Sequence, residues 1–284
     1  MKFGSDQRVL WLSQVRSVPY RERVELAARH GYGTISTSPA DYDRTLASGL
    51  SLTDIRNIAS DHGVRLSYLD PMVFWVPQGL PSEGDEGLIT YLDRSPDDFF
   101  RIAEELQVDR IHLIGAFPEG RYSIAELTEY YARTCQRAAT YGLKCLIEAM
   151  PLWGLRKVEE VHQIVRDAAQ PNSGIIFDTW HYTRAGRNDK IIAEIPAGMI
   201  DTVQIADGTK VAPAGRSNVI DCLSYRVPIG DGELANKDIL ELLRDAGHLT
   251  SVGPEIFSAA LDKLPGEEIM ALIQPGFDSL LESL

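Results

Sequence analysis

Cysteine is scarce in this chain of 284 residues. Only Cys135, Cys145 and Cys222 occur, and no two of them have the C-x-x-C spacing. An odd number of widely spaced cysteines argues against a disulfide framework and against a structural zinc site. Each cysteine is therefore expected to be a small buried hydrophobic side chain.

Long apolar runs are also missing. No stretch of about 18 apolar residues is present, so no membrane-spanning helix is expected. The first residues, MKFGSDQRVLWLSQ, lack the apolar core of a signal peptide. These absences predict a soluble, cytoplasmic protein with no membrane partner.

Basic residues are few, with 28 Lys and Arg against 41 Asp and Glu and a formal net charge of -13. A surface of this charge does not neutralise phosphates, which argues against nucleic acid and anionic membranes as partners. The composition, 44% hydrophobic and 24% charged, is that of a globular protein able to bury a full core. The expected partner is a small-molecule substrate.

What the sequence does contain is a series of short apolar runs, rich in β-branched and aromatic residues. The runs cover residues 8–13, 33–37, 64–70, 110–115, 144–150, 174–179, 202–207 and 251–257. Their nearly continuous apolar character is typical of parallel strands that are covered on both faces.

Segments with helical spacing alternate with these runs. They cover residues 19–32, 51–64, 95–109, 123–143, 156–169, 187–196, 235–248 and 265–284, the last interrupted by Pro275. Several reach a glycine just before the next run, which is the usual end signal of a helix that precedes a strand. The segment 51–64 opens on a capping residue, either Ser51 or Thr53.

Eight strands that alternate with eight helices predict an α/β fold, a single (β/α)8 TIM barrel over residues 1–284. The alternative is an open doubly wound sheet, which carries a glycine-rich phosphate turn after its first strand. No G-x-G-x-x-G follows any of the predicted strands. The barrel is therefore favoured.

Four consecutive predicted strands end in a polar side chain. They are Glu148 in CLIEAMP, Asp178 in IIFDTWH, Gln204 in DTVQIADG and Glu255 in VGPEIFS. One such residue is usually a helix cap or a surface charge, but the carboxyl ends of barrel strands meet at the active-site face. Three carboxylates in one cavity repel each other unless a cation lies between them. Oxygen donors of this kind predict a site for one divalent metal ion, Mn²⁺ or Mg²⁺ in preference to zinc.

These strand ends resemble the xylose isomerase-like TIM barrel superfamily of sugar phosphate isomerases and epimerases, which includes ketose 3-epimerases, inosose dehydratase and 3-dehydroshikimate dehydratase. Its members carry Glu after strand five, D-x-x-H after strand six, usually His after strand seven and Glu after strand eight. Glu148, the pair Asp178 and His181 in DTWH, and Glu255 match. Gln204 replaces the usual histidine; its amide oxygen can still hold a hard cation, and a glutamine here is similar to 3-dehydroshikimate dehydratases.

The resemblance also implies roles for individual residues. Glu148 and Glu255 would be the catalytic acid/base pair, one on each side of the substrate. His181 would bind substrate or relay a proton, and Arg226, just before VPIGDGEL (227–234), resembles the family arginine that contacts substrate oxygens. From the residues alone, His181 could equally be a surface or capping residue, and Arg226 an ordinary loop arginine.

A divalent ion beside a 2-oxo or 1,2-diol group polarises the carbonyl and stabilises the enediolate that forms when the α-proton leaves. The predicted enzyme is therefore a metal-dependent isomerase or epimerase of a sugar-like keto or polyol substrate. If a β-hydroxyl is available the same enolate can expel it, so the alternative is a dehydratase or another lyase that performs β-elimination on a cyclic or glycosidic substrate. A barrel that binds a ligand without catalysis is a third hypothesis. An endonuclease IV activity is rejected, because it needs more histidines than the six present and a basic face for DNA.

Three aromatic side chains are candidates for substrate binding: Tyr68 on the third strand, and Trp153 and Trp180 beside the predicted ligands. Packing is the simpler role for each, but several aromatic rings at one barrel mouth indicate a substrate with a ring or apolar face. A cyclic polyol, an aromatic precursor or a glycoside fits this description. Because family members are often dimers or tetramers, the resemblance also implies a homo-oligomer.

Two further polar residues have simpler explanations. His112, on the fourth strand, is expected to be a core histidine with its hydrogen bonds satisfied. Asp207, in QIADG, is either a partner that orients a ligand or a turn residue with no part in the chemistry.

Overall fold

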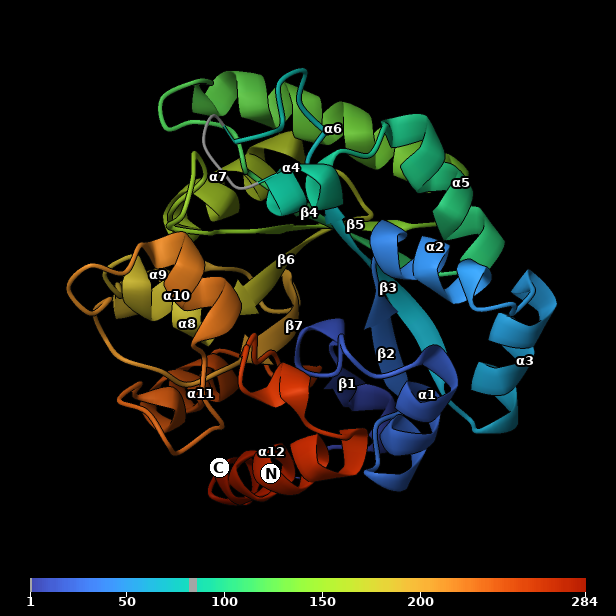
Figure 1. Ribbon diagram of the computed structural model, residues 1–284. Helices are drawn as coiled ribbons and strands as arrows, with labels where there is room; N and C mark the ends of the chain where they lie inside the picture. The colour runs from blue at the N-terminus through green and yellow to red at the C-terminus, as the bar shows by residue number, and fades with distance from the viewer. Residues whose placement is uncertain (1, 82–85) are drawn as a thin grey trace.

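Eight parallel strands form the centre of the molecule (Figure 1). The computed structural model describes residues 2–81 and 86–284. The strands are β1 (Val9–Leu10), β2 (Thr34–Thr37), β3 (Arg65–Met72), β4 (Arg110–Ile114), β5 (Lys144–Glu148), β6 (Ser173–Asp178), β7 (Ile200–Ile205) and β8 (Val252–Pro254). Each strand bonds to the next in chain order, and each predicted apolar run overlaps one strand. The predicted TIM barrel is confirmed.

The barrel closes where β8 meets β1. Arg8, next to β1, forms a parallel bridge with Val252. A Cβ on Gly253 would overlap the carbonyl oxygen of Val9, so only glycine allows the two strands to approach this closely.

The first strand is shorter than predicted. The apolar run 8–13 was expected to be extended throughout, but β1 ends at Leu10 and a 3-10 helix, η2 (Leu12–Gln14), follows. The reason is local, because the backbone N–H of Leu12 donates to the Ser36 hydroxyl rather than to a backbone carbonyl of β2.

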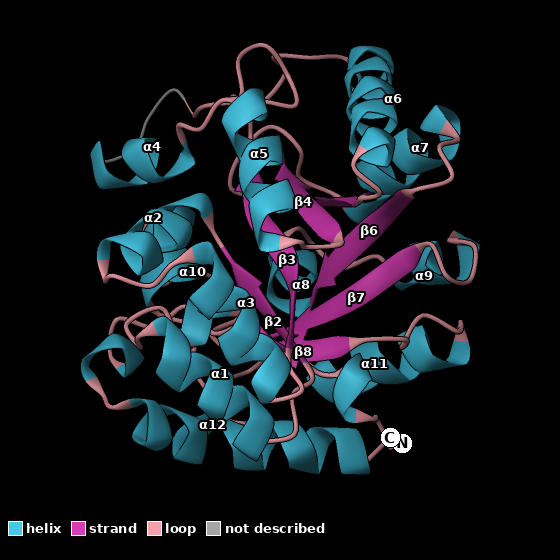
Figure 2. Cartoon of the chain, turned by 90° about the vertical axis from the view of Figure 1, so that its right-hand side faces the viewer, coloured by secondary structure: helices cyan, strands magenta, loops and turns pink. Residues whose placement is uncertain are grey.

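Helices surround the strands in both views (Figures 1 and 2). They are α1 (Tyr20–Arg29), α2 (Pro39–Ala47), α3 (Leu52–Asp61), α4 (Glu86–Leu92), α5 (Pro96–Leu106), α6 (Ile124–Thr140), α7 (Val158–Ala168), α8 (Thr179–Arg184), α9 (Asp189–Glu194), α10 (Asn218–Ser224), α11 (Asn236–Asp245) and α12 (Gly266–Glu282), with further 3-10 turns η1 (Ser5–Gln7) and η3 (Leu261–Lys263). All eight predicted helices are present. The additional helices α2, α4, α8 and α10 lie in the segments that follow β2, β3, β6 and β7.

Two local predictions are decided by the structure. Ser51, not Thr53, caps α3: its hydroxyl accepts from the Asp54 N–H, and the Asp54 carboxylate accepts from the Ser51 N–H. The interruption predicted at Pro275 is wrong, because α12 continues through it from Gly266 to Glu282. Apolar residues on both sides of Pro275, including Ile273 and Phe277, stay buried and hold the helix against the barrel.

The barrel interior is layered. One buried cluster contains Tyr68, Leu146 and Ile176 together with Val9 and Trp11. Side chains two positions apart on a strand point to the same side of the sheet. The next layer of the barrel interior, closer to the carboxyl ends of the strands, therefore consists of the side chains of Asp70, Glu148 and Asp178.

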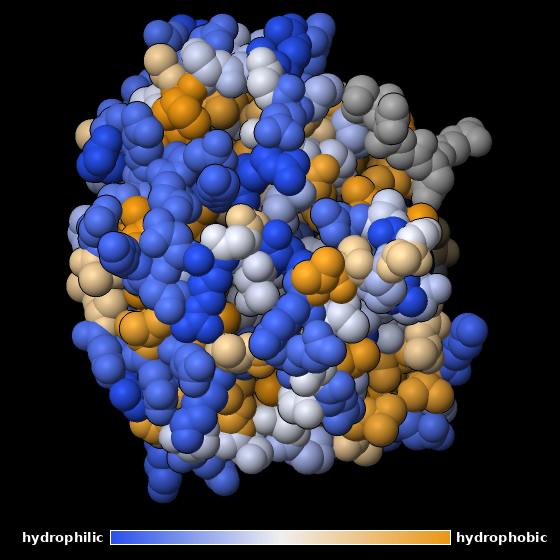
Figure 3. Space-filling model, turned by 90° about the vertical axis from the view of Figure 1, so that its left-hand side faces the viewer, coloured by the Kyte–Doolittle hydropathy of each residue, from blue (hydrophilic) through white to orange (hydrophobic). Residues whose placement is uncertain are grey.

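The outer surface is mainly polar on the face that Figure 3 shows, where hydrophobic side chains appear in small separate groups. Across the described parts of the chain, none of the helices has the length and apolar character that crossing a bilayer requires.

Candidate metal centre

The four predicted strand-end residues come together at the carboxyl ends of β5 to β8. Glu148 ends β5, Asp178 ends β6, and Asp178 lies opposite Gln204 in the β6–β7 ladder. Gln204 is in turn paired with Gly253 of β8, two residues before Glu255. All four residues are at least 96% buried.

His181 joins two of these carboxylates. One ligand atom each from Glu148, Asp178 and His181 lies within 4.8 Å of the other two. The D-x-x-H spacing produces this arrangement through a helix cap, because the Asp178 carboxylate accepts a hydrogen bond of 2.8 Å from the His181 N–H at the start of α8.

A divalent cation fits the oxygen donors at these strand ends. Glu148 Oε1 and Gln204 Oε1 are buried and find no hydrogen-bond partner among the described residues. A buried acceptor without a donor costs about 1–3 kcal/mol, which a bound cation would relieve. The Gln204 amide is oriented for this role, since its Nε2 donates to Glu255 Oε1 over 2.7 Å and leaves the oxygen available.

Arg226 lies at the centre of the site and is completely buried. Its Nη1 is 2.6 Å from Asp178 Oδ2 and 3.4 Å from Glu255 Oε2, and its Nη2 is 3.1 Å from His181 Nε2. It is therefore no ordinary loop arginine. Its guanidinium supplies positive charge between two carboxylates that come from different strands.

The pKa values of the buried acidic groups shift in different directions. Burial acts to raise the pKa of the Asp178 carboxyl, but the Arg226 guanidinium and the contacts with His181 and Glu255 together outweigh it and leave that pKa below its usual value. Burial raises the pKa of Glu148 to about 7 and that of Glu255 well above its usual range. Burial also lowers the pKa of His181 to about 3, so its imidazole is neutral at pH 7 and can ligate a metal or accept a hydrogen bond.

Sequence reasoning missed His112 as a member of the site. It is buried, as expected, but its Nδ1 lies 2.9 Å from Asp70 and its Nε2 lies 3.0 Å from Glu148. Burial acts to lower the pKa of His112, and the two carboxylates outweigh it and raise the pKa to about 10. The available signal was its position as the polar residue in the middle of an apolar strand.

The family follows from the whole chain. A family model described as xylose isomerase-like TIM barrel matches residues 24–274. The chain belongs to this family.

Known members are similar over different lengths. Inosose isomerase of Bacillus velezensis is 23% identical over 257 residues, which are 87% of each chain. 3-Dehydroshikimate dehydratase of Pseudomonas aeruginosa is 27% identical over 200 residues, 67% of this chain but only 29% of that relative. The crystal structure of the IolI protein with a bound zinc atom superimposes with a TM-score of 0.81 at 18% identity, covering 98% of this chain and 99% of the other. The isomerase and the dehydratase are enzymes, which confirms the expectation that the chain is an enzyme.

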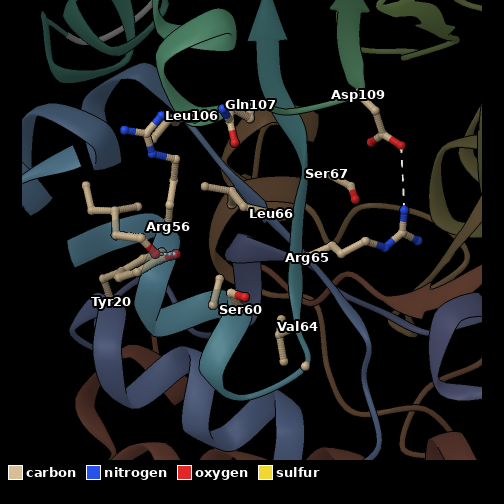
Figure 4. Close-up of a pocket in the computed structure, with 13 residues that line it drawn as sticks. Tyr20, Arg56, Ser60, Val64, Arg65, Leu66, Ser67, Leu106, Gln107 and Asp109 are labelled. Carbon is tan, nitrogen blue, oxygen red and sulfur yellow. Dashed lines mark hydrogen bonds and ion pairs between the residues drawn. The ribbon is translucent and has the colours of Figure 1, made fainter. Parts of the chain in front are cut away.

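In this xylose isomerase-like barrel, a cavity of about 70 Å³ lies directly at the carboxylates. Glu148, Glu255, His112, His181 and Trp153 are among the residues that line it. Active sites of TIM barrels form at this end of the strands. The larger cavity in Figure 4, about 480 Å³, lies at the opposite end, against Val64, Arg65 and Asp109, where β3 and β4 begin, and holds none of the predicted site residues among its described lining.

The structure does not bring every predicted aromatic residue to this cavity. Trp153 lines it, but Tyr68 lies one layer deeper, with its ring centre 4.7 Å from that of Trp11. Trp180 is buried with its ring edge-on to His181 and 5.0 Å from the Arg226 guanidinium. Neither Tyr68 nor Trp180 is among the described residues that line the cavity, so Trp180 supports site residues from behind.

Asp207 behaves as a structural residue of its loop. Its carboxylate accepts hydrogen bonds from the backbone N–H groups of Gly208, Gly230 and Leu234. These bonds tie the segment VPIGDGEL to the end of β7, which favours the turn explanation over a contact with a ligand.

Proposed function

We propose that this barrel is a divalent-metal-dependent isomerase or epimerase that acts on a sugar-like keto or polyol substrate. The observation that carries the proposal is that two buried carboxylates, Glu148 and Glu255, border one cavity beside the Glu148–Asp178–His181 cluster. Two carboxylates on one substrate pocket are the arrangement needed to remove an α-proton and to return one.

The ligands we propose are Glu148, Asp178, Gln204 and Glu255, whose hard oxygen donors favour Mn²⁺ or Mg²⁺. A bound ion of this kind supplies polarisation of the substrate carbonyl and stabilises negative charge on its oxygen. The unpartnered, buried Gln204 oxygen supports this ligand set.

The remaining residues position the reacting groups. His112 holds one carboxylate oxygen of Glu148, and the Gln204 amide holds one of Glu255. His181 lines the cavity, which supports its proposed role in binding a substrate oxygen, and Arg226 holds the ring nitrogen of His181 at 3.1 Å. One glutamate takes the α-proton and the other returns a proton to the opposite face, which inverts that carbon.

Dehydration is the second candidate, and the burial of Glu255 favours it. Burial raises the pKa of Glu255 well above its usual range, which favours the protonated form of this carboxyl. A protonated Glu255 could deliver that proton to a leaving β-hydroxyl after Glu148 has removed the α-proton. The similarity to a 3-dehydroshikimate dehydratase supports the same chemistry.

Proton exchange with solvent tests the proposal. Protein supplied with Mn²⁺ is incubated in D₂O with an inosose, a ketohexose or 3-dehydroshikimate, and NMR follows deuterium at the α-carbon. We expect exchange with inversion, reduced at least a hundredfold in Glu148→Gln and Glu255→Gln but retained in the exposed control Glu129→Gln. A new enone absorbance would assign the dehydratase instead, and absence of both signals with every substrate would contradict the proposal.

A further inference from the structure

A second chamber adjoins the cavity at Glu148. Its volume is about 360 Å³, and it shares five described lining residues with the smaller cavity, namely Asp70, Leu88, Tyr91, Leu223 and Phe257. We call it the distal chamber and define it by Ser13, Arg16, Asp41, Arg44, Tyr91 and Phe257. It lies at the carboxyl ends of β1 and β2, on the same face as the candidate metal centre, and residues of α2 and α4 line it. These two helices are neighbours in Figures 1 and 2.

The volumes of the two cavities indicate a substrate with two parts. At about 30 Å³ per water, the cavity of about 70 Å³ holds the volume of roughly two waters, enough for a carbonyl and the carbon beside it. The distal chamber holds roughly twelve water volumes, which is more than enough for one sugar ring. A molecule that reacts between Glu148 and Glu255 therefore has room for a second ring-sized part.

A buried hydroxyl on the wall of the distal chamber lacks a partner. Ser13 is 4% exposed, and its Oγ makes no hydrogen bond to any residue in the described part of the chain. Leaving such a group unsatisfied is costly, and a ligand hydroxyl can both donate to it and accept from it.

The charges around the distal chamber are balanced. Its described lining contains two arginines, Arg16 and Arg44, and two aspartates, Asp41 and Asp70. Arg44 pairs with Asp41 at 2.6 Å. An anionic ligand would find no surplus of positive charge among these groups, whereas hydroxyls can use the remaining donors and acceptors.

The other arginine is also committed to a partner. Arg16 contacts Asp262 at 2.6 Å, and its guanidinium lies 5.4 Å from the Phe257 ring centre. Phe257 and Tyr91 supply aromatic surface to the same chamber. Polar edges combined with apolar faces suit a hydroxylated ring, which has C–H faces and a polar rim.

We propose that the distal chamber binds a second, neutral, hydroxylated ring of the substrate. The substrate class is then a glycoside or a similarly extended keto-polyol rather than a single small sugar. This inference rests on the proposed function for the reactive end and adds the chemistry of the far end.

Calorimetric binding tests the inference without turnover. Protein supplied with Mn²⁺ is titrated with glucose, maltose, cellobiose and glucose 6-phosphate. We expect at least one disaccharide to bind ten times more tightly than glucose. If neither disaccharide exceeds glucose, or if glucose 6-phosphate binds most tightly, the inference is overturned, the second result assigning the chamber to an anion.

Two variants locate the effect. Ser13→Ala removes the unpartnered hydroxyl, and Ala40→Trp fills the chamber from its wall. Both should lose the disaccharide advantage, whereas the exposed control Ser279→Ala should keep it; an unchanged advantage in Ala40→Trp contradicts the proposed location. The Mn²⁺ affinity and the melting temperature of each variant show that it is folded.

The two proposals fail separately. Disaccharide binding without proton exchange on any substrate would support the ligand proposed for the distal chamber and contradict the proposed isomerase activity. Proton exchange on a small keto-polyol with no disaccharide advantage would do the reverse.

Discussion

His112 contacts two carboxylates from different strands, Asp70 on β3 and Glu148 at the end of β5. Groups that hold a metal ligand from behind fix its orientation, and replacing them commonly weakens metal binding 10–100-fold. We therefore predict that His112→Asn lowers the Mn²⁺ affinity by about this factor in a calorimetric titration. His62→Asn, at the exposed end of α3, is the control, and an unchanged affinity in His112→Asn would refute the role.

A buried charge pair gives a second residue-scale prediction. Arg23 and Asp41 lie 2.5 Å apart, and each side chain is 3% exposed. Removing one partner of such a pair costs about 3 kcal/mol or more, because the other charge stays buried. Arg23→Met should lower the free energy of unfolding by about this amount, measured by urea denaturation.

The matched control is Arg133→Met, which removes an arginine from a pair that is about 70% exposed. Its effect should stay within about 0.5 kcal/mol. Equal effects of the two substitutions would show that the Arg23–Asp41 pair does not stabilise the fold.

The same pair predicts a pH dependence. Burial acts to raise the pKa of the Asp41 carboxyl, but Arg23 outweighs it, with help from Arg44 and Thr37, and leaves that pKa below its usual value. A lowered folded-state pKa gives stability that is present above the unfolded pKa of about 3.9 and lost as the pH falls through the folded pKa. The stability difference between wild type and Asp41→Asn should be constant from pH 7 to 5 and shrink below about pH 4. A difference that grows on acidification would contradict this sign.

At the residue scale, the sequence was sufficient for some site residues and insufficient for others. Glu148, Asp178, Gln204 and Glu255 were predictable because each ends an apolar strand, and that position alone places it at the active-site face. His112 depends on contacts across three neighbouring strands, which a linear pattern does not contain. Tyr68 was placed at the site although it lies two residues, one barrel layer, below Asp70.

Secondary-structure elements show a similar division. The long helices and the apolar strands were visible through their periodicity, whereas α8 has six residues and begins directly after Asp178, so its length carries little periodic signal. The end of β1 at Leu10 follows from the hydrogen bond between Leu12 and Ser36, which comes from another strand. Such tertiary contacts override local preference.

Closure of the barrel between β8 and β1 gives the prediction at this scale. Gly253→Ala places a methyl group against the Val9 carbonyl and should destabilise the fold by about 3 kcal/mol. Gly120→Ala is the control, since its Cβ would meet no described atom within 4 Å and only the positive φ of 73° costs about 1 kcal/mol. Thermal melting compares them, and equal melting temperatures would show that the strands can separate without cost.

For the whole molecule, the barrel places acidic and basic groups in one buried centre that no single segment contains. Glu148 and Asp178 end two strands, Glu255 directly follows a third, and Arg226 comes from the loop between α10 and α11. A cation that binds the folded chain alone stabilises it by about 2.7 kcal/mol at one hundred times its dissociation constant. Adding Mn²⁺ at that excess should raise the melting temperature by about 5 °C.

The most direct test is a calorimetric titration of the metal-free protein with Mn²⁺, repeated with the double variant Glu148→Gln/Asp178→Asn. The proposed metal centre predicts one ion per chain with a dissociation constant in the micromolar range or below, and at least a hundredfold weaker binding in the variant, since two ligands lose their charge. A wild-type protein that binds no divalent ion at micromolar concentration, or a variant that binds it equally well, would contradict the metal-dependent chemistry proposed for Glu148 and Glu255.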